Sequence, residues 1–372
     1  MPPDFSKWWN CLKKHTKRSQ SWLRRARDLS NEIASERPFR YFTLCARPMI
    51  DVFMLAKEGI LDHDESFGNL ADVVFCEYNQ EYFPEITEMI GIEGSGFLGE
   101  LERFVLFEDD GYSSEFPTLR SIQLELENQD LEPEHQDILM LKRQHLEFAN
   151  KFPFDFLNLD FCGYYYPKPP GILQINRTVD RMLELQNRES QDQDGRRISI
   201  NEFVLAVTCK FDANVPEEAF RRLQRIVTEN RDNHEAYSQA LLDSRGTLHA
   251  EEWQQADNYD FFLGSWPKEL LRIARDHGLT MQILDYMHYE RTGDEGNIYH
   301  IVSLSCGFKR NGAVASYLAE SIRVLNPGSR IFIDEVDRTS AVGKTLLADL
   351  EEIVAIRNAR ARVVGRLELG AP

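Results

Sequence analysis

The spacing of apolar residues sets apart a short N-terminal segment. Between Phe5 and Ile33, apolar residues recur every three to four positions, and lysines and arginines fill most of the places between them. This pattern predicts a basic amphipathic helix in an N-terminal extension, residues 1–36, whose tryptophans pack on the rest of the protein.

After residue 36 the pattern changes to short apolar runs that alternate with helical stretches. The predicted strands are 39–46, 71–79, 95–107 with its turn, 154–163 (FDFLNLDFCG) and 198–212. Helical patterns lie between them, for example at 131–152 and 175–188. Strands that alternate with helices at this spacing predict an α/β fold with a parallel sheet covered on both faces.

The alternation ends in a different unit. A helix predicted at 267–278 is followed by two long strand patterns within 279–308, which a Gly-Asp-Glu-Gly-Asn turn joins. Two strands joined by a short glycine-containing turn form an antiparallel hairpin. The main domain is therefore predicted to span 37–308. A C-terminal extension, 309–372, contains helical patterns, a short strand at 330–336 and an arginine-rich end.

The composition predicts a folded protein that does not enter membranes. The 372 residues are 42% apolar, which supplies a full core, yet no uncharged apolar run is long enough for a membrane span. The six cysteines lie far apart and form no C-x-x-C pair, and the histidines show no metal-ligand spacing. Reduced thiols in a cytoplasmic protein without a zinc site are the expectation.

The net charge of −18 is unevenly distributed. Residues 60–150 carry 22 acids and four bases, whereas residues 1–40 carry ten bases and four acids. The acidic part would repel a nucleic acid. The basic N-terminal helix and the arginine-rich tail are the expected contacts for one. Protein partners, or simply solvated charged faces, are the open alternatives.

Candidate site residues follow the predicted strands, because ligands of open α/β sheets bind at the carboxyl ends of the strands. Glu77 follows the second strand, and Glu100 follows the third within GFLGELERF. Asp160 lies at the end of the fourth strand within NLDFCG. The loop after the first strand reads Cys45-Ala46-Arg47-Pro48.

Five strand–helix units followed by a β-hairpin resemble the class I S-adenosylmethionine-dependent methyltransferases, over roughly residues 37–308. The resemblance implies a Rossmann-like, seven-stranded, mostly parallel sheet with a C-terminal β-hairpin, here with helical extensions at both ends. It implies S-adenosylmethionine as cofactor. Glu77 would accept hydrogen bonds from the ribose hydroxyls and Glu100 from the adenine amino group. Cys45, Ala46 and Arg47 would line the methionine part.

The stretch NLDFCG is similar to the DLDPFG pattern of tRNA guanine-N2 methyltransferases and related DPFG and DPPY proteins. Phe161 and Cys162 stand where that pattern has proline and an aromatic residue. The resemblance implies that Asp160, supported by Asn158, orients an exocyclic amine of the methyl acceptor. The substrate contacts implied on the same stretch are Phe161, Gly163, Tyr164 and Tyr165.

Two features keep other functions open. The family has a glycine-rich loop after the first strand, so that the backbone can approach the cofactor closely, and this chain has no glycine there. Arg47 also brings a positive charge towards a cofactor that is itself a cation. The leading hypothesis is a methyltransferase acting on an exocyclic amine of a nucleic-acid base. The alternatives are a non-catalytic methyltransferase-fold scaffold or sensor subunit, and a protein whose Arg47 binds the phosphate of another nucleotide.

One nucleotide-binding pattern in the tail is not convincing. RIFIDEVDRTSAVGKT contains a Gly-Lys-Thr, but a phosphate loop needs a glycine five residues earlier, where this chain has Arg338. The stretch therefore predicts a strand, a turn and a helix, with Lys344 in solvent.

Overall fold

The fold is described from a computed structural model of the chain. The residues that it describes are 11–33, 37–61, 73–77, 79–91, 96–98, 101, 122–123, 126, 132–164, 175–187, 190–191, 197–198, 200–211, 215–292, 298–310 and 315–370.

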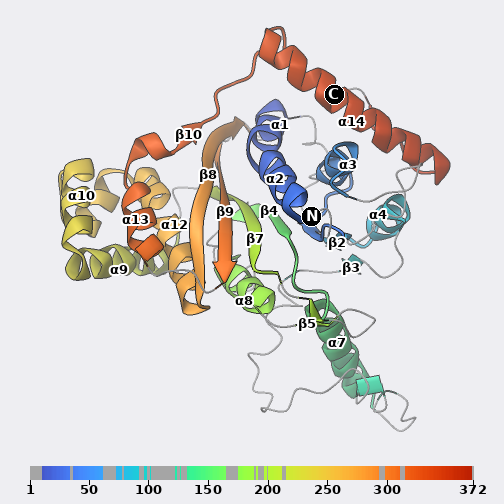
Figure 1. The fold of residues 1–372 in the computed structure, drawn as a ribbon, viewed down its shortest axis with the longest axis horizontal. Coiled ribbons are helices and arrows are strands. Elements are labelled where there is room, and N and C mark those ends of the chain that lie inside the picture. The colour runs from blue at the N-terminus through green and yellow to red at the C-terminus, as the bar shows by residue number, and fades with distance from the viewer. Residues whose placement is uncertain are drawn as a thin grey trace.

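A mixed β-sheet forms the centre of the protein (Figure 1). Its order is β10-β8-β9-β7-β4-β1-β2-β3. The strands are β1 (Tyr41–Leu44), β2 (Val73–Glu77), β3 (Gly96–Leu98), β4 (Phe156–Tyr164), β7 (Glu202–Phe211), β8 (Leu279–Thr292), β9 (Ile298–Arg310) and β10 (Ile331–Phe332). A separate two-stranded ribbon pairs β5 (Ser190–Gln191) with β6 (Arg197–Ile198).

The sheet is mostly parallel, as predicted, with one antiparallel hairpin. β3, β2, β1, β4 and β7 pair in parallel. β9 runs antiparallel to both of its neighbours, β7 and β8, which confirms the predicted hairpin. The sheet contains an eighth strand, β10, in addition to the seven predicted for the main domain. It corresponds to the predicted C-terminal strand 330–336, but it is only two residues long and pairs in parallel with β8.

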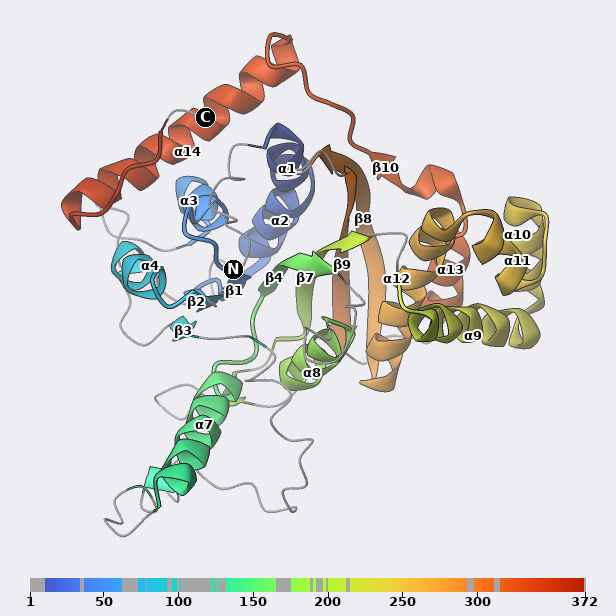
Figure 2. The ribbon, with the colours of Figure 1, turned by 180° about the vertical axis from the view of Figure 1, so that it is seen from behind.

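One face of the sheet is covered by helices from the two ends of the chain and from the first half of the domain. Side chains such as Phe156, Tyr41 and Phe75 point to this face and pack on those helices. The helices are α2 (Leu23–Ile33), α3 (Ile50–Lys57), α4 (Phe83–Ile90) and α14 (Ala341–Val363). Both views place α14 across the outside of this layer (Figure 1, Figure 2).

The opposite face carries the larger core. Leu157 and Leu159 of β4 point to it, one residue out of step with Phe156, as the pleat of a strand requires. The helices on this side are α7 (Pro133–Ala149), α8 (Ile175–Asn187), α9 (Glu217–Asn233), α10 (Glu235–Arg245), α11 (Ala250–Ala256), α12 (Asn258–Asp276) and α13 (Ala315–Arg323).

The predicted start of α12 at residue 267 is wrong. The helix begins at Asn258, because the carboxylate of Asp257 caps it and accepts the backbone N–H groups of Tyr259 and Asp260 at 2.9 Å each. Pro267 therefore lies inside the helix instead of in its first turn.

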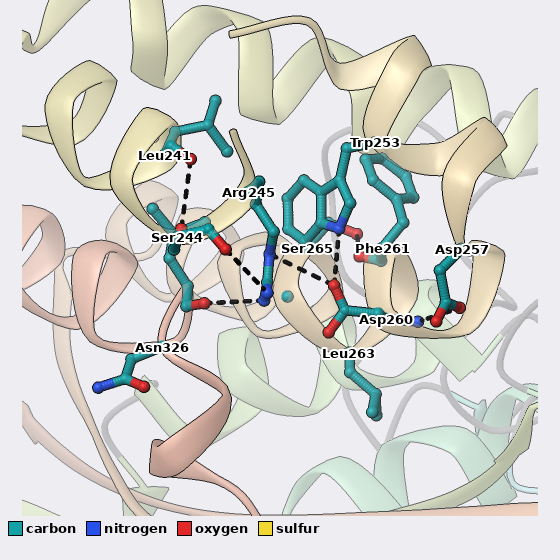
Figure 3. A network of polar contacts seen from close by, with 12 residues as sticks. Leu241, Ser244, Arg245, Trp253, Asp257, Asp260, Phe261, Leu263, Ser265 and Asn326 are labelled. Carbon is teal, nitrogen blue, oxygen red and sulfur yellow. Dashed lines mark hydrogen bonds and ion pairs between the residues drawn. The ribbon is translucent and has the colours of Figure 1, made fainter. Parts of the chain in front are cut away.

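A polar network joins this helical layer to the C-terminal part of the chain (Figure 3). Asp260 accepts a hydrogen bond from the indole of Trp253 at 2.7 Å and pairs with Arg245 at 3.3 Å. Arg330, just before β10, pairs with the same carboxylate at 2.7 Å. Arg245 also donates to the carbonyl of Leu325 at 2.8 Å. These contacts fix the segment that leads to β10 and α14.

The N-terminal extension is a layer of the fold. α1 (Leu12–Lys17) continues through the π-helical turn η2 (Arg18–Trp22) into α2, and the three segments lie across the sheet (Figure 1). Trp22 is 1% exposed and packs on Phe156 with ring centroids 5.7 Å apart. The predicted packing of the tryptophan stripe on the main domain holds at this residue. In the described part of the chain, no helix is both long and apolar enough to cross a membrane.

Candidate functional site

Three predicted site residues fall in one row at the carboxyl edge of the parallel strands. Leu44 is opposite Cys76, and Thr43 is opposite Asn158. Glu77 and Asp160 therefore reach the level of Cys45, one on each side of β1. Two strand spacings separate them, which is about 10 Å. Side chains two residues apart on a strand point to the same face. Phe75 and Phe156 point to the face covered by α2, α3 and α4, so Glu77 and Asp160, at even spacing from them, point to the same face.

Glu77 ends β2 as a buried acid. It is 8% exposed, and its Oε1 accepts the backbone N–H of Asn79 at 2.6 Å. The carboxylate thus stabilises the turn that follows its own strand, and it stands at the edge position expected for a ligand contact. Burial raises the pKa of the neighbouring Cys45 thiol well above its ordinary value, and Asp51 and Glu77 add to this effect. Cys45 is therefore a protonated thiol without nucleophilic character.

The glycine-less loop after β1 makes its turn with a methionine. Met49 has φ 51° and ψ 31°, the left-handed region that favours glycine, and its N–H donates to the carbonyl of Ala46 at 2.8 Å. Among the described residues, it is the non-glycine residue with positive φ. The loop thus contains a left-handed residue although it has no glycine.

Arg47 is held against α4. Its Nε donates to Glu85 Oε2 at 2.9 Å, and its guanidinium lies 5.3 Å from the ring centroid of Tyr82. Arg357 of α14 pairs with the other oxygen of Glu85 at 2.9 Å. These contacts engage Arg47 within the protein and leave the phosphate-binding alternative without support.

Asn158 belongs to a buried polar cluster one row below the edge. Its Nδ2 donates to Asp51 Oδ2 at 3.1 Å and to the Tyr41 hydroxyl at 3.0 Å. The hydroxyls of Tyr41 and Thr43 donate to the same Asp51 oxygen at 2.8 and 2.7 Å. The cluster binds β1, β4 and α3 together, so Asn158 supports the position of β4 beneath Asp160.

Asp160 forms an ion pair with the N-terminal helix. Lys14 Nζ lies 2.7 Å from Asp160 Oδ2, and the two side chains are 18% and 15% exposed. Burial by itself would raise the pKa of Asp160, but the charges of Lys14, Lys17 and Arg18 hold it well below its usual range. The residue is therefore an ionised hydrogen-bond acceptor throughout the physiological pH range.

The chain bulges directly after Asp160. Asp160 is opposite Thr208, but Tyr164, four residues later, is opposite Lys210. Regular pairing thus ends at the acid, and β4 resumes beyond a local irregularity, a feature common beside functional sites. Asp160 is thus the last residue before the irregularity, although β4 itself, predicted to end near this acid, continues to Tyr164.

Lys14, Lys17 and Arg18 are the site residues that the sequence reading missed. We expected the basic residues of the first helix to contact a nucleic acid or a protein partner, or to be solvated, but Lys17 is 2% and Arg18 7% exposed. Lys17 Nζ donates to Thr208 Oγ1 at 2.7 Å, and Ser21 shares a hydrogen bond with Ser305 at 3.0 Å. The spacing of positions 14, 17, 18 and 21 is that of one buried face of a helix, although the residues there are polar. This spacing could have indicated the contact with the sheet.

The remaining predicted residues divide into two groups. Phe161 is 4% exposed and lies in the core of the opposite face, where it has no surface for stacking on a substrate. Gly163 and Tyr164 belong to the backbone of β4. The side chain of Tyr164, and Glu100 and Tyr165 as a whole, lie outside the described residues.

The basic segments expected to contact nucleic acid are largely paired within the protein. On the first helix, Arg24 and Arg25 pair with Asp285 of β8 at 3.2 Å each. In the tail, Arg366 pairs with Glu88 at 2.7 Å and Arg360 donates to the carbonyl of Glu88 at 2.8 Å. A nucleic acid would have to compete with these internal partners.

Within the described residues, no group of three or more metal-binding side chains is arranged to hold a metal ion. No protein-family model, curated protein or solved structure matches the chain. The interpretation of the site therefore rests on its own geometry.

Proposed function

We propose that this protein is a class I methyltransferase-like enzyme that uses S-adenosylmethionine to methylate an exocyclic amine, as of a nucleobase. The observation that carries the proposal is the strand order. β3-β2-β1-β4-β7 follows the 3-2-1-4-5 order of Rossmann-like sheets, whose ligands bind where the order reverses, between β1 and β4. Glu77 and Asp160 flank that point, and the antiparallel last strand β9 is the feature that the resemblance implies.

The residues at the edge fit the proposed cofactor in two respects. Glu77 is an acid at the end of β2, where a carboxylate accepts the hydroxyls of a ribose. The guanidinium of Arg47 is held against α4 by Glu85, which also pairs with Arg357, so Arg47 is engaged within the protein next to the loop that would meet the sulfonium. The cofactor would supply an activated methyl group, and a sulfonium donor needs no general base in the protein.

Asp160 would orient the acceptor. As an ionised carboxylate it accepts hydrogens from an amine, which aims the nitrogen lone pair. The ammonium of Lys14 lies 2.7 Å from Oδ2 of this carboxylate. An acceptor amine would take the place of Lys14, an exchange of one nitrogen donor for another at the same oxygen.

A second candidate function follows from the same contact. Because Lys14 pairs with Asp160 and the amide nitrogen of Asn158 is engaged in the buried cluster, both predicted catalytic residues have structural roles. This favours a non-catalytic methyltransferase-fold subunit that holds protein partners.

Calorimetric titration with S-adenosylhomocysteine separates the two candidates. The enzyme proposal predicts binding to the wild-type protein, and at least about tenfold weaker binding to Glu77→Gln, since hydrogen bonds to charged groups contribute about 1.5–3 kcal/mol. Glu81→Gln, at an exposed acid in the following turn, is the matched control and should bind as wild type. Asp160→Asn should still bind the nucleoside but lose methyl transfer. A wild-type protein that gives no heat at millimolar ligand would refute the proposal.

A further inference from the structure

Arg18 is a buried cation with an unsatisfied guanidinium nitrogen. Its side chain lies in the π-helical turn η2, and the residue is 7% exposed. Its Nη1 is fully buried and has no hydrogen-bond partner, and among the described residues no carboxylate forms an ion pair with this guanidinium. A buried charge without a partner is costly, so such a group is expected only where something else compensates it.

The surroundings of Arg18 carry an excess of positive charge. Lys14 and Arg18 are one helical turn apart, and Lys17 adjoins both on the side facing the sheet. Asp160 is the carboxylate in direct contact with this group, through Lys14. Asp51 acts on Lys17 from farther away and already accepts three hydrogen bonds. Three cations thus lie near one acid, Asp160, which is in contact with Lys14.

Hydroxyl groups line the same row of the sheet. Thr208, opposite Asp160, accepts from Lys17 at 2.7 Å and shares a hydrogen bond with Ser303 at 3.0 Å. Lys14 and Asp160 at the rim remain partly open to solvent, with side chains 18% and 15% exposed. Guanidinium, ammonium and hydroxyl groups are the donors that phosphate oxygens take in proteins.

We propose that the Arg18 cluster, formed by Lys14, Lys17, Arg18 and Thr208, binds a phosphate group of the substrate beside Asp160. The inference rests on the proposed function and names its acceptor class, a nucleotide whose phosphate lies next to the amine that Asp160 orients. Phosphate is preferred to a carboxylate because its second negative charge matches the excess positive charge of the three cations over Asp160.

Calorimetry with inorganic phosphate and with guanosine 5′-monophosphate tests the site, each measured against sodium chloride at equal ionic strength. Wild type should bind both probes, and guanosine should bind at least tenfold more weakly than its monophosphate. Arg18→Met should weaken both probes at least tenfold. Arg24→Met, on the same helix with an exposed guanidinium paired to Asp285, is the matched control and should bind as wild type. Lys14→Met provides a second variant at the rim and should also weaken both probes.

Two results would overturn the inference: no phosphate binding by wild type, or equal phosphate affinity in wild type and Arg18→Met. Where Arg18→Met does not fold, Lys14→Met takes its place, and equal phosphate affinity in Lys14→Met and wild type would overturn the inference. S-adenosylhomocysteine, titrated into the same wild-type preparation, distinguishes the two failures. Binding of the nucleoside without binding of phosphate contradicts the phosphate site alone, whereas absence of nucleoside binding contradicts the proposed function.

Discussion

Lys17 couples the stability of this protein to alkaline pH. The residue is 2% exposed and donates to Thr208 at 2.7 Å. Burial lowers the pKa of Lys17 from 10.5 to about 8, although Asp160 acts in the opposite direction. Between these values the unfolded chain keeps a proton that the folded protein has lost. Through this residue, the free energy of unfolding therefore rises with pH across that window.

We expect Lys17→Met to remove this rise, which amounts to about 3 kcal/mol for a shift of this size. Urea unfolding at about pH 7.5, 9 and 10.5 measures it, with the difference between wild type and variant read at each pH. Lys344→Met, at an exposed lysine of α14, should leave the slope of wild type unchanged. An unchanged slope in Lys17→Met would show that the buried ammonium does not titrate as described.

At the scale of elements, the carboxylate of Asp349 links α14 to α1 and α3. Asp349 lies 2.8 Å from Nε2 of the buried His15 and 2.5 Å from Nζ of Lys57. The hydrogen bond from His15 lowers the pKa of Asp349 from 3.8 to about 2, and Lys57 acts in the same direction. Burial acts in the opposite direction. The stability that this carboxylate contributes is present above about pH 4 and is lost as the pH falls towards 2.

Asp349→Asn should therefore lower the free energy of unfolding at neutral pH by about 1–2 kcal/mol, discounted for partial exposure. Its stability should also fall less than that of wild type between pH 4 and 2. Thermal unfolding followed by circular dichroism over this range checks both effects. Glu351→Gln, on an exposed position of the same helix, should behave as wild type. Parallel acid profiles of Asp349→Asn and wild type would contradict the role of the carboxylate.

The first turn of α14 depends on a glycine for space. Ser340 caps the helix by accepting the N–H of Gly343 at 3.0 Å. A Cβ at Gly343 would lie 2.0 Å from the carbonyl oxygen of Asp337. The Gly-Lys-Thr of this turn thus has a structural explanation, a capped helix start with Lys344 exposed, as the sequence predicted.

Gly343→Ala should lower the free energy of unfolding by about 1–3 kcal/mol, the cost of overpacking against backbone. The usual effect of this change within a helix has the opposite sign, a gain of up to about 1 kcal/mol. Urea unfolding gives the sign directly. Gly370→Ala meets no atom within 4 Å and should have little effect. A stabilised Gly343→Ala would mean that the turn before α14 adapts easily.

Elements with a strong apolar period were predictable from the sequence, and elements held by polar contacts were not. The hairpin of β8 and β9 and the helix α8 follow their patterns closely. The sheet-facing side of α1 and η2 was missed because its buried residues are lysine, arginine and serine. The start of α12 was missed because the cap at Asp257 lies ten residues before Pro267, which resembles a helix start.

At the scale of the whole molecule, the sequence predicted which edge of the sheet carries the site but not how its charges are compensated. Glu77 and Asp160 lie level with each other on either side of β1, as their places after strands suggested. The ion pairs around this edge involve residues from distant parts of the chain. Lys14 arrives from the N-terminus, and Arg357, which shares Glu85 with Arg47, arrives from the C-terminus. No local pattern reports such long-range pairing.

The central claim is that the carboxyl edge around β1 binds an S-adenosyl nucleoside. Hydrogen exchange followed by mass spectrometry, with and without S-adenosylhomocysteine, tests both the ligand and its location. The account predicts slower exchange in the loop at residues 45–49 and at the end of β2, and loss of this protection in Glu77→Gln. Unchanged exchange throughout the chain, or protection confined to segments away from this edge, would contradict it.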